Sequence, residues 1–258
     1  MNRYSLIMEA YTELMPEIAS SRKAAAIATN PPLRKALREL GAIPTEGLFM
    51  GIATDALPVL LNLHDAVPGP ILIVGDAGAG KTDLLRLTAR AAEITHPTSA
   101  LQFATLTNHP EEWDEFENIS NSIGIFPLYA DSAQEFLFTA ASWARESKPN
   151  SRTVLLLLDD LDAATNLDFE ARQTLRWLLL RGPARRVWPI VTLNASRSEN
   201  LMPWLEAFRS RIFGSIKDDC RAQQLLAVGA NLQTLNSNAQ FTLREGNHWL
   251  RFWLPSLD

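Results

Sequence analysis

The sequence predicts an α/β fold in which helices cover both faces of a largely parallel sheet. Two apolar runs, at residues 71–74 and 154–158, are typical of strands buried on both faces of such a sheet. Strand-like and helix-like segments alternate around them, which favours parallel strands joined by helices. Hydrophobic residues make up 47% of the 258-residue chain and charged residues 21%, which excludes a disordered, collagen-like or disulfide-dense protein.

The N-terminal residues predict helices. Residues 1–40 read as two helices separated at Asn30-Pro31-Pro32, and Gly41 ends the second. We expect residues 1–46 to form a helical appendage, either a docking or oligomerisation helix pair or a cap on the sheet. Residues 47–258 are expected to form the main domain.

The main domain opens with two short strands, at residues 48–50 and 57–63, before the strand at 71–74. Later strands are predicted at residues 101–106, 127–130, 153–158, 189–194 and 211–216. The helices between and after them are predicted at residues 81–94, 111–116, 133–145, 170–180 and 219–228. A hairpin pairs residues 240–244 with 248–253 and closes the domain.

Composition limits the cellular setting and the partners. The single cysteine, Cys220, excludes an internal disulfide, and no apolar run reaches membrane-spanning length. Glu9 and Glu13 stand where a signal peptide would be apolar. We therefore expect a soluble, cytoplasmic protein. The net charge of −5 argues against a wholly basic nucleic-acid binder but leaves room for a local basic patch.

The segment Gly75-Asp76-Ala77-Gly78-Ala79-Gly80-Lys81-Thr82 matches the phosphate-binding pattern G-x-x-x-x-G-K-[ST] in full. It follows an apolar strand and opens a helix, so backbone N–H groups and the helix N-terminus can hold phosphates. Lys81 is expected to reach the β- and γ-phosphates of ATP, and Thr82 to ligate Mg²⁺. We include Asp83 in the predicted cofactor site. Asp76 is unusual beside a polyphosphate; we expect it to face solvent or a neighbouring subunit, with a weakened site as the alternative.

A second motif ends the apolar strand at residues 153–158. Asp159, 78 residues after Lys81, is predicted to hold the Mg²⁺ shell, and Asp160 to polarise the attacking water. The spacing leaves room for an additional strand–helix unit between the motifs. Asp160 is one methylene shorter than the glutamate usual there, so slow hydrolysis is a further expectation.

A third candidate is Asn194, at the end of the strand at residues 189–194. A polar residue there can contact the γ-phosphate, which would give Asn194 a catalytic role beside Asp160 and Lys81. The alternative is an asparagine that caps the following turn.

Charge is unevenly distributed along the chain. Residues 108–170 contain 13 acidic and 3 basic residues, whereas residues 172–221 contain 10 basic and 4 acidic ones. This asymmetry suits head-to-tail packing of identical subunits, with an arginine entering the next subunit's site, or contact with a phosphate backbone. Solvated helix faces with local ion pairs are the alternative.

From residue 47 onward the chain resembles the motor domain of the FtsK/SpoIIIE DNA translocases, within the FtsK–HerA group of P-loop ATPases. Besides the two motifs, the resemblance is carried by residues 51–63, 131–143, 211–226 and 239–246. It implies a RecA-like core, a homo-oligomeric and hexameric ring, Mg²⁺-ATP, and movement of duplex DNA through a pore. Asn194 then stands where the family has a glutamine, and Arg181, Arg185 and Arg211 are candidates for contacts in trans.

The sequence also departs from that family. Asp160 replaces the usual glutamate, and Asn108-His109-Pro110 stands near a position where the family often has Asp-Pro-Lys. We therefore expect a minimal or degenerate DNA translocase or transfer ATPase, with a membrane partner in some settings. One alternative is a protein-translocating ATPase like those of type VII secretion. The other is a nucleotide-binding assembly or regulatory module that hydrolyses ATP weakly.

Overall fold

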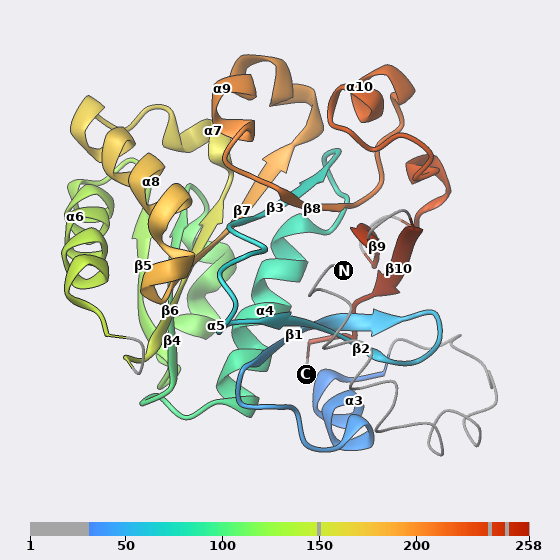
Figure 1. The fold of residues 1–258 in the computed structure, drawn as a ribbon, viewed down its shortest axis with the longest axis horizontal. Coiled ribbons are helices and arrows are strands. Elements are labelled where there is room, and N and C mark those ends of the chain that lie inside the picture. Colours follow the sequence, from blue (N-terminus) through green and yellow to red (C-terminus); the bar gives the residue numbers. More distant parts are fainter. Residues whose placement is uncertain (1–30, 149–150, 237–238, 246–247, 258) are drawn as a thin grey trace.

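The computed structural model describes residues 31–148, 151–236, 239–245 and 248–257. Within these residues ten strands form one sheet, in the order β2-β1-β10-β9-β8-β3-β7-β6-β4-β5 (Figure 1). The strands are β1 (Gly47–Ala53), β2 (Pro58–Asn62), β3 (Ile71–Gly75), β4 (Leu101–Thr107), β5 (Ser122–Pro127), β6 (Thr153–Asp159), β7 (Val187–Asn194), β8 (Ser210–Phe213), β9 (Gln240–Glu245) and β10 (His248–Trp253). The six strands from β8 to β5 are parallel, and the remaining four pair antiparallel.

The helices lie on both faces of the sheet, as predicted. The α-helices are α3 (Leu33–Leu40), α4 (Lys81–Thr95), α5 (Asp114–Glu117), α6 (Asp131–Glu146), α7 (Leu161–Ala164), α8 (Phe169–Arg181), α9 (Met202–Leu205) and α10 (Asp219–Gln224). The 3₁₀ turns are η1 (Pro110–Trp113), η2 (Pro183–Arg185), η3 (Ala195–Leu201) and η4 (Leu232–Thr234). None of the described helices is both long and apolar enough to cross a bilayer.

Alternate residues of the central strands pack in two separate hydrophobic cores, one on each face of the sheet. Leu72 and Val74 of β3 pack with α6, α8 and α9 on one face, whereas Ile71 and Ile73 pack with α3 and α4 on the other. This period of two is the reason that the apolar runs are continuous, because a strand covered on both faces has no polar side.

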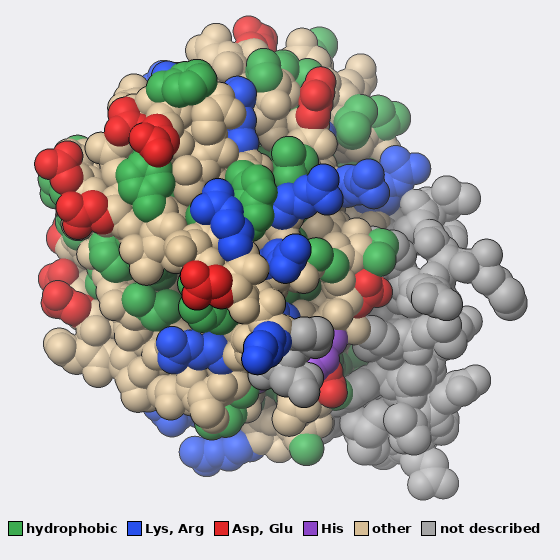
Figure 2. Space-filling model, turned by 60° about the vertical axis from the view of Figure 1, so that its left-hand side comes forward, with side chains coloured by type: hydrophobic (Ala, Val, Ile, Leu, Met, Phe, Trp, Pro, Cys, Tyr) green, Lys and Arg blue, Asp and Glu red, His purple; other side chains and the backbone are tan. Residues whose placement is uncertain are grey.

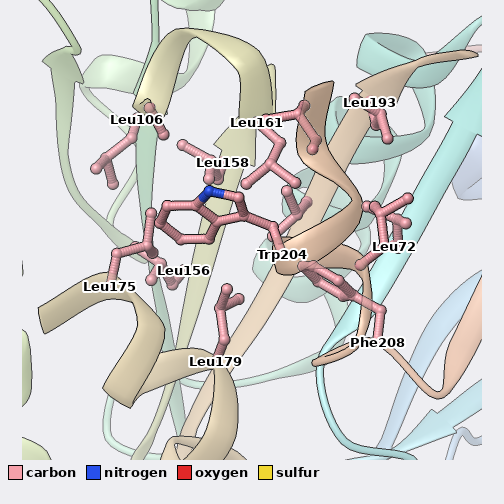
Figure 3. Packing of buried hydrophobic residues seen from close by; sticks show 14 of the residues in the cluster. Leu72, Leu106, Leu156, Leu158, Leu161, Leu175, Leu179, Leu193, Trp204 and Phe208 are labelled. Carbon is pink, nitrogen blue, oxygen red and sulfur yellow. The ribbon is translucent and has the colours of Figure 1, made fainter. Parts of the chain in front are cut away.

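The core on the α8 face is centred on Trp204. In Figure 3 its indole ring lies among leucines of β6, α7 and α8, and Phe208 packs beside it. Trp204 is 6% exposed, so truncating it would leave a large cavity, at a typical cost of about 3–5 kcal/mol. This packing holds the segments after β6 and β7 against the sheet, and both segments contribute to the candidate site.

Helix α3 lies against α4 on the opposite face. Its Leu33, Leu37 and Leu40 are buried in the same core as α4, and the Leu33 amide donates to the Ser256 carbonyl at 2.9 Å. This packing is that of a helical cap, one of the two roles expected for the N-terminal residues. The first predicted helix lies outside the described residues, so the division of the chain at residues 46 and 47 stays a proposal.

Most predicted strands and helices are confirmed, with shifts at their ends. The strand predicted at residues 127–130 is wrong: β5 ends at Pro127. As an edge strand that pairs with β4 alone, β5 is largely half-exposed, and its Gly124 and Pro127 are residues that weaken a strand pattern. Strand β8 ends at Phe213 instead of residue 216, and α10 ends at Gln224 instead of residue 228. The short α7, η3 and α9 were not predicted.

Candidate nucleotide-binding site

The predicted phosphate loop joins β3 to α4 at the carboxyl edge of the parallel strands. Gly78 and Gly80 have φ angles of +74° and +79°, a conformation that glycine adopts without steric cost. Gly75 is needed for a different reason, since a Cβ atom there would lie 2.7 Å from the Ala79 Cβ. The loop therefore folds back tightly on itself and leads directly into the N-terminus of α4, where Ala77 is exposed.

Lys81 reaches back into this loop. Its ammonium donates to the carbonyl oxygens of Gly75, at 3.1 Å, and Asp76, at 2.7 Å. Burial lowers the pKa of Lys81, while the nearby carboxylates of Asp159, Asp76 and Asp160 act to raise it. The ammonium is thus held at the mouth of the loop by two neutral carbonyls, which an anionic phosphate can replace as a stronger partner.

Thr82 and Asp159, predicted to share the metal, are in direct contact. The Thr82 Oγ1 donates to the Asp159 carboxylate, with distances of 2.9 Å to Oδ2 and 3.2 Å to Oδ1. Asp159 is 8% exposed, and its Oδ1 also accepts from the Thr192 hydroxyl at 2.8 Å. A buried carboxylate needs such donors. β7, which carries Thr192, lies between the strands that carry the two motifs.

Asp160 adopts an unusual backbone conformation, with φ +84° and ψ +95°. Its amide donates to the Thr192 hydroxyl at 2.8 Å, and its Oδ1 accepts from the Asp162 amide at 3.1 Å, which caps α7. Burial raises the pKa of Asp160; the Asp162 amide and Arg197 act to lower it, and the carboxylates of Asp162 and Asp159 to raise it. A carboxylate with a raised pKa is better suited to accept a proton than an ordinary one.

Asn194 ends β7 beside Gly75, its partner in the parallel register. Its Oδ1 accepts from the Ser196 amide at 3.2 Å and the Ser196 hydroxyl at 3.0 Å, so the side chain caps η3. The structure thus shows the capping role that was the alternative interpretation. A role for Asn194 at the γ-phosphate stays a proposal.

Asp76, which we expected to face solvent or a neighbouring subunit, is half-buried and has a hydrogen-bond partner within its own chain. Its Oδ2 accepts from the Lys217 amide at 2.9 Å, and its own amide donates to the Ser215 carbonyl at 2.9 Å. The carboxylate therefore ties the phosphate loop to the segment after β8, which accounts for an acid at this position. Asp83, in the first turn of α4, lies 3.9 Å from Arg86 and is half-exposed.

The three arginines proposed to act in trans differ in their surroundings. Arg181 and Arg185 are exposed and lie just before β7, at the edge of the sheet opposite Asn194 and the phosphate loop. The guanidinium of Arg211 donates to the carbonyls of Leu225, Leu205 and Phe208, at 2.9, 3.0 and 3.3 Å. Arg211 is thus bound within its own chain, which favours a structural role; a contact of any of the three arginines in trans stays a proposal.

Two residues of the site were not singled out in the sequence. Thr192 bonds to both acids of the second motif, and its position two residues before Asn194, on the same face of β7, is a signal that could have identified it. Arg197 lies in η3 at the phosphate-loop edge, 3.7 Å from Asp162. No local pattern distinguishes it from the other arginines of residues 172–221.

The arrangement fits Mg²⁺-ATP. The residues that would hold the metal, Thr82 and Asp159, offer only oxygen atoms, the ligands that Mg²⁺ prefers, and they are already adjacent. The glycine loop and the N-terminus of α4 present backbone N–H groups for the phosphates. When bound, Mg²⁺ would supply charge neutralisation of the phosphates.

No family model matches the sequence, and no curated protein matches it, but solved structures share its fold. The EccC ATPases 2 and 3 of Thermomonospora curvata, solved with a signal sequence peptide, align with 90% of this chain at 15% identity and a TM-score of 0.68. The pCW3 conjugation coupling protein TcpA, solved with ATPγS, aligns with 90% at 14% identity and a TM-score of 0.62. The genome packaging NTPase B204 of Sulfolobus turreted icosahedral virus 2, solved with AMPPCP, aligns with 74% at 13% identity and a TM-score of 0.51.

These alignments cover unequal shares of the other proteins. This chain spans 44% of that EccC structure and 28% of the larger EccC cytoplasmic domain, against 71% of TcpA and 99% of B204. At such low identity they establish the fold alone, which is the predicted RecA-like core of P-loop ATPases with a mostly parallel sheet.

Proposed function

We propose that this chain is a Mg²⁺-dependent ATPase of the FtsK–HerA group that works in a homo-oligomeric, hexameric ring and moves a polymer. The observation that carries the proposal is the contact between Thr82 and Asp159, next to a complete phosphate loop in which Lys81 is already in place. In this account Lys81 and Thr82 bind the phosphates and metal, Asp159 holds the metal, and Asp160 accepts a proton from water.

Duplex DNA is the polymer that we favour. The structural neighbours include a conjugation coupling protein and a genome packaging NTPase. On the face shown in Figure 2, Lys and Arg side chains form a row from the centre towards the right, while Asp and Glu gather along the left margin. Such a row can neutralise backbone phosphates, and binding of that kind weakens as salt releases counterions.

A protein substrate is the second candidate. EccC of this fold was solved with a signal sequence peptide, and the net charge of −5 of this chain disfavours general attraction to DNA. A third candidate is an assembly module with weak hydrolysis. It is favoured by Asp160, whose carboxylate is engaged in capping α7.

Steady-state ATPase rates with Mg²⁺ test these candidates. Rates are measured alone, with linear duplex DNA at two salt concentrations, and with a panel of secretion-signal peptides. Lys81→Ala is the blank, and Lys35→Ala, a change at a 66% exposed side chain on α3, is the matched control. Stimulation by duplex that fades with salt supports the DNA motor, whereas stimulation by peptide alone selects the protein substrate.

Two further outcomes are informative. A rate no higher than the Lys81→Ala blank, combined with ATP-dependent assembly in light scattering, selects the assembly module. Absence of both turnover and nucleotide binding would refute the proposal as a whole.

A further inference from the structure

We propose that Thr192 is a positioning residue that sets the geometry of both acids of the second motif without touching nucleotide or metal itself. The inference rests on the proposed ATPase function, because it assigns a part in that site to a residue that no motif includes. It is drawn from the contacts of one buried hydroxyl group.

The Thr192 hydroxyl can donate its hydrogen bond to only one of its two partners. The Asp160 amide can only donate, so the Thr192 oxygen accepts from it at 2.8 Å. The single hydroxyl proton is then available for the Asp159 Oδ1, also at 2.8 Å. One side chain thus carries a hydrogen-bond chain from the backbone of Asp160 to the carboxylate of Asp159, and each link fixes the polarity of the next.

Thr192 is well suited to fix positions. It is 1% exposed on the central strand β7, and β-branched side chains have few χ1 rotamers. Two hydroxyl groups donate to the Asp159 carboxylate: that of Thr192 to Oδ1, and that of Thr82 mainly to Oδ2. The orientation of the carboxylate relative to Thr82, and so of the oxygens available to Mg²⁺, is therefore set in part by Thr192. Residues that orient a metal ligand in this way typically contribute about 10- to 100-fold to metal affinity or activity.

The second contact restrains a strained residue. Asp160 has a φ of +84°, which is unfavourable for a residue with a side chain and persists only when surrounding contacts over-determine it. Two such contacts are the hydrogen bond from its backbone amide to the Thr192 hydroxyl and the hydrogen bond that its carboxylate accepts from the Asp162 amide. The adjoining Leu161 is also completely buried. Without the Thr192 hydroxyl, Asp160 can relax and its carboxylate moves from its present position.

The test compares Thr192→Val, which keeps the shape and removes the hydroxyl, with Thr192→Ser, which keeps the hydroxyl. Thr105→Val is the matched control, because Thr105 is a completely buried threonine of β4 whose hydroxyl has no hydrogen-bond partner among the described residues. We expect Thr192→Val to lower kcat about 10- to 100-fold and to raise the Mg²⁺ concentration for half-maximal rate. The kcat of Thr192→Ser should stay within a few-fold of the wild-type value, and the kcat of Thr105→Val should equal it.

A readout independent of hydrolysis separates this inference from the proposed function. Amide hydrogen exchange by NMR, without nucleotide, should show loss of protection at Asp160 in Thr192→Val and not in Thr105→Val. If the wild type hydrolyses no ATP, the proposed function fails, while exchange at Asp160 still tests the positioning role. Unchanged protection at Asp160 in Thr192→Val, or equal losses of rate in Thr192→Val and Thr105→Val, would overturn the inference.

Discussion

Arg211 offers a prediction that separates a structural role from a role between subunits. Its guanidinium links the carbonyl of Leu205, at the end of α9, to that of Leu225, just after α10. Arg211→Ala leaves these buried acceptors without their donor. We therefore expect the variant to lose stability as an isolated chain, whether or not a ring forms.

The magnitude follows from the geometry. Hydrogen bonds to a charged group contribute about 1.5–3 kcal/mol each. The bonds at 2.9 and 3.0 Å count in full, while the third, from Nε to Phe208 at 3.3 Å, is long and adds little. Because the side chain is partly accessible, water replaces some of the lost donors, and we expect the free energy of unfolding to fall by about 2–4 kcal/mol.

Urea unfolding at pH 7 measures this loss. Arg185→Ala is the control, since removing the exposed Arg185 side chain should lower the free energy of unfolding by no more than about 0.5 kcal/mol. Arg211→Lys should recover only part of the loss, because one ammonium cannot reach all three carbonyls. A loss below about 1 kcal/mol in Arg211→Ala, together with loss of ATPase activity in a folded protein, would refute the structural assignment and support a role in trans.

Two further predictions concern the site. Burial raises the pKa of Asp160. The ATPase rate should therefore begin to fall on acidification at a pH above about 3.9, the ordinary aspartate pKa. Because the folded chain then holds a proton that the unfolded chain has lost, the free energy of unfolding should decline as pH rises through the raised pKa. Asp160→Asn keeps an acceptor for the Asp162 amide but should lower kcat at least about 100-fold and abolish this pH dependence; pH–rate profiles showing the same acid limb in the variant would contradict the assignment. Gly75→Ala places a Cβ atom 2.7 Å from the Ala79 Cβ, and we expect it to lower the free energy of unfolding in urea by about 1–3 kcal/mol. Adding Ala79→Gly should restore part of this loss. No recovery in the double variant would show that the clash is not the cause.

The parts of the fold that sequence predicts are those governed by local pattern. β3 and β6 are covered on both faces, so their residues are uniformly apolar and recognisable. The edge strand β5 is paired on one side only, and its glycine and proline obscured the strand pattern, so the prediction was misplaced to residues 127–130. Gly75, Lys81 and Thr82 are recognisable because the phosphate loop requires particular residue types at fixed spacing.

The parts that sequence did not predict depend on contacts between distant segments. The role of Asp76 depends on the Lys217 amide, 141 positions away, and that of Arg211 on a carbonyl 14 positions away. Thr192 is an ordinary strand residue by composition, and only the adjacency of β6 and β7 brings its hydroxyl to Asp159. Such roles arise from the packing of the sheet, which no local motif encodes.

We propose that this phosphate loop and Asp159 together bind Mg²⁺-ATP. The decisive experiment is equilibrium binding of a fluorescent ATP analogue, measured with Mg²⁺ and with EDTA, to wild type, Lys81→Ala and the Lys35→Ala control. We expect saturable binding that Mg²⁺ strengthens in wild type and in Lys35→Ala. Affinity should be at least about 10-fold weaker in Lys81→Ala, in which the phosphate-binding ammonium is absent. Equal affinity in wild type and Lys81→Ala, or no binding to the wild type, would show that the loop and Asp159 are not a Mg²⁺-ATP site.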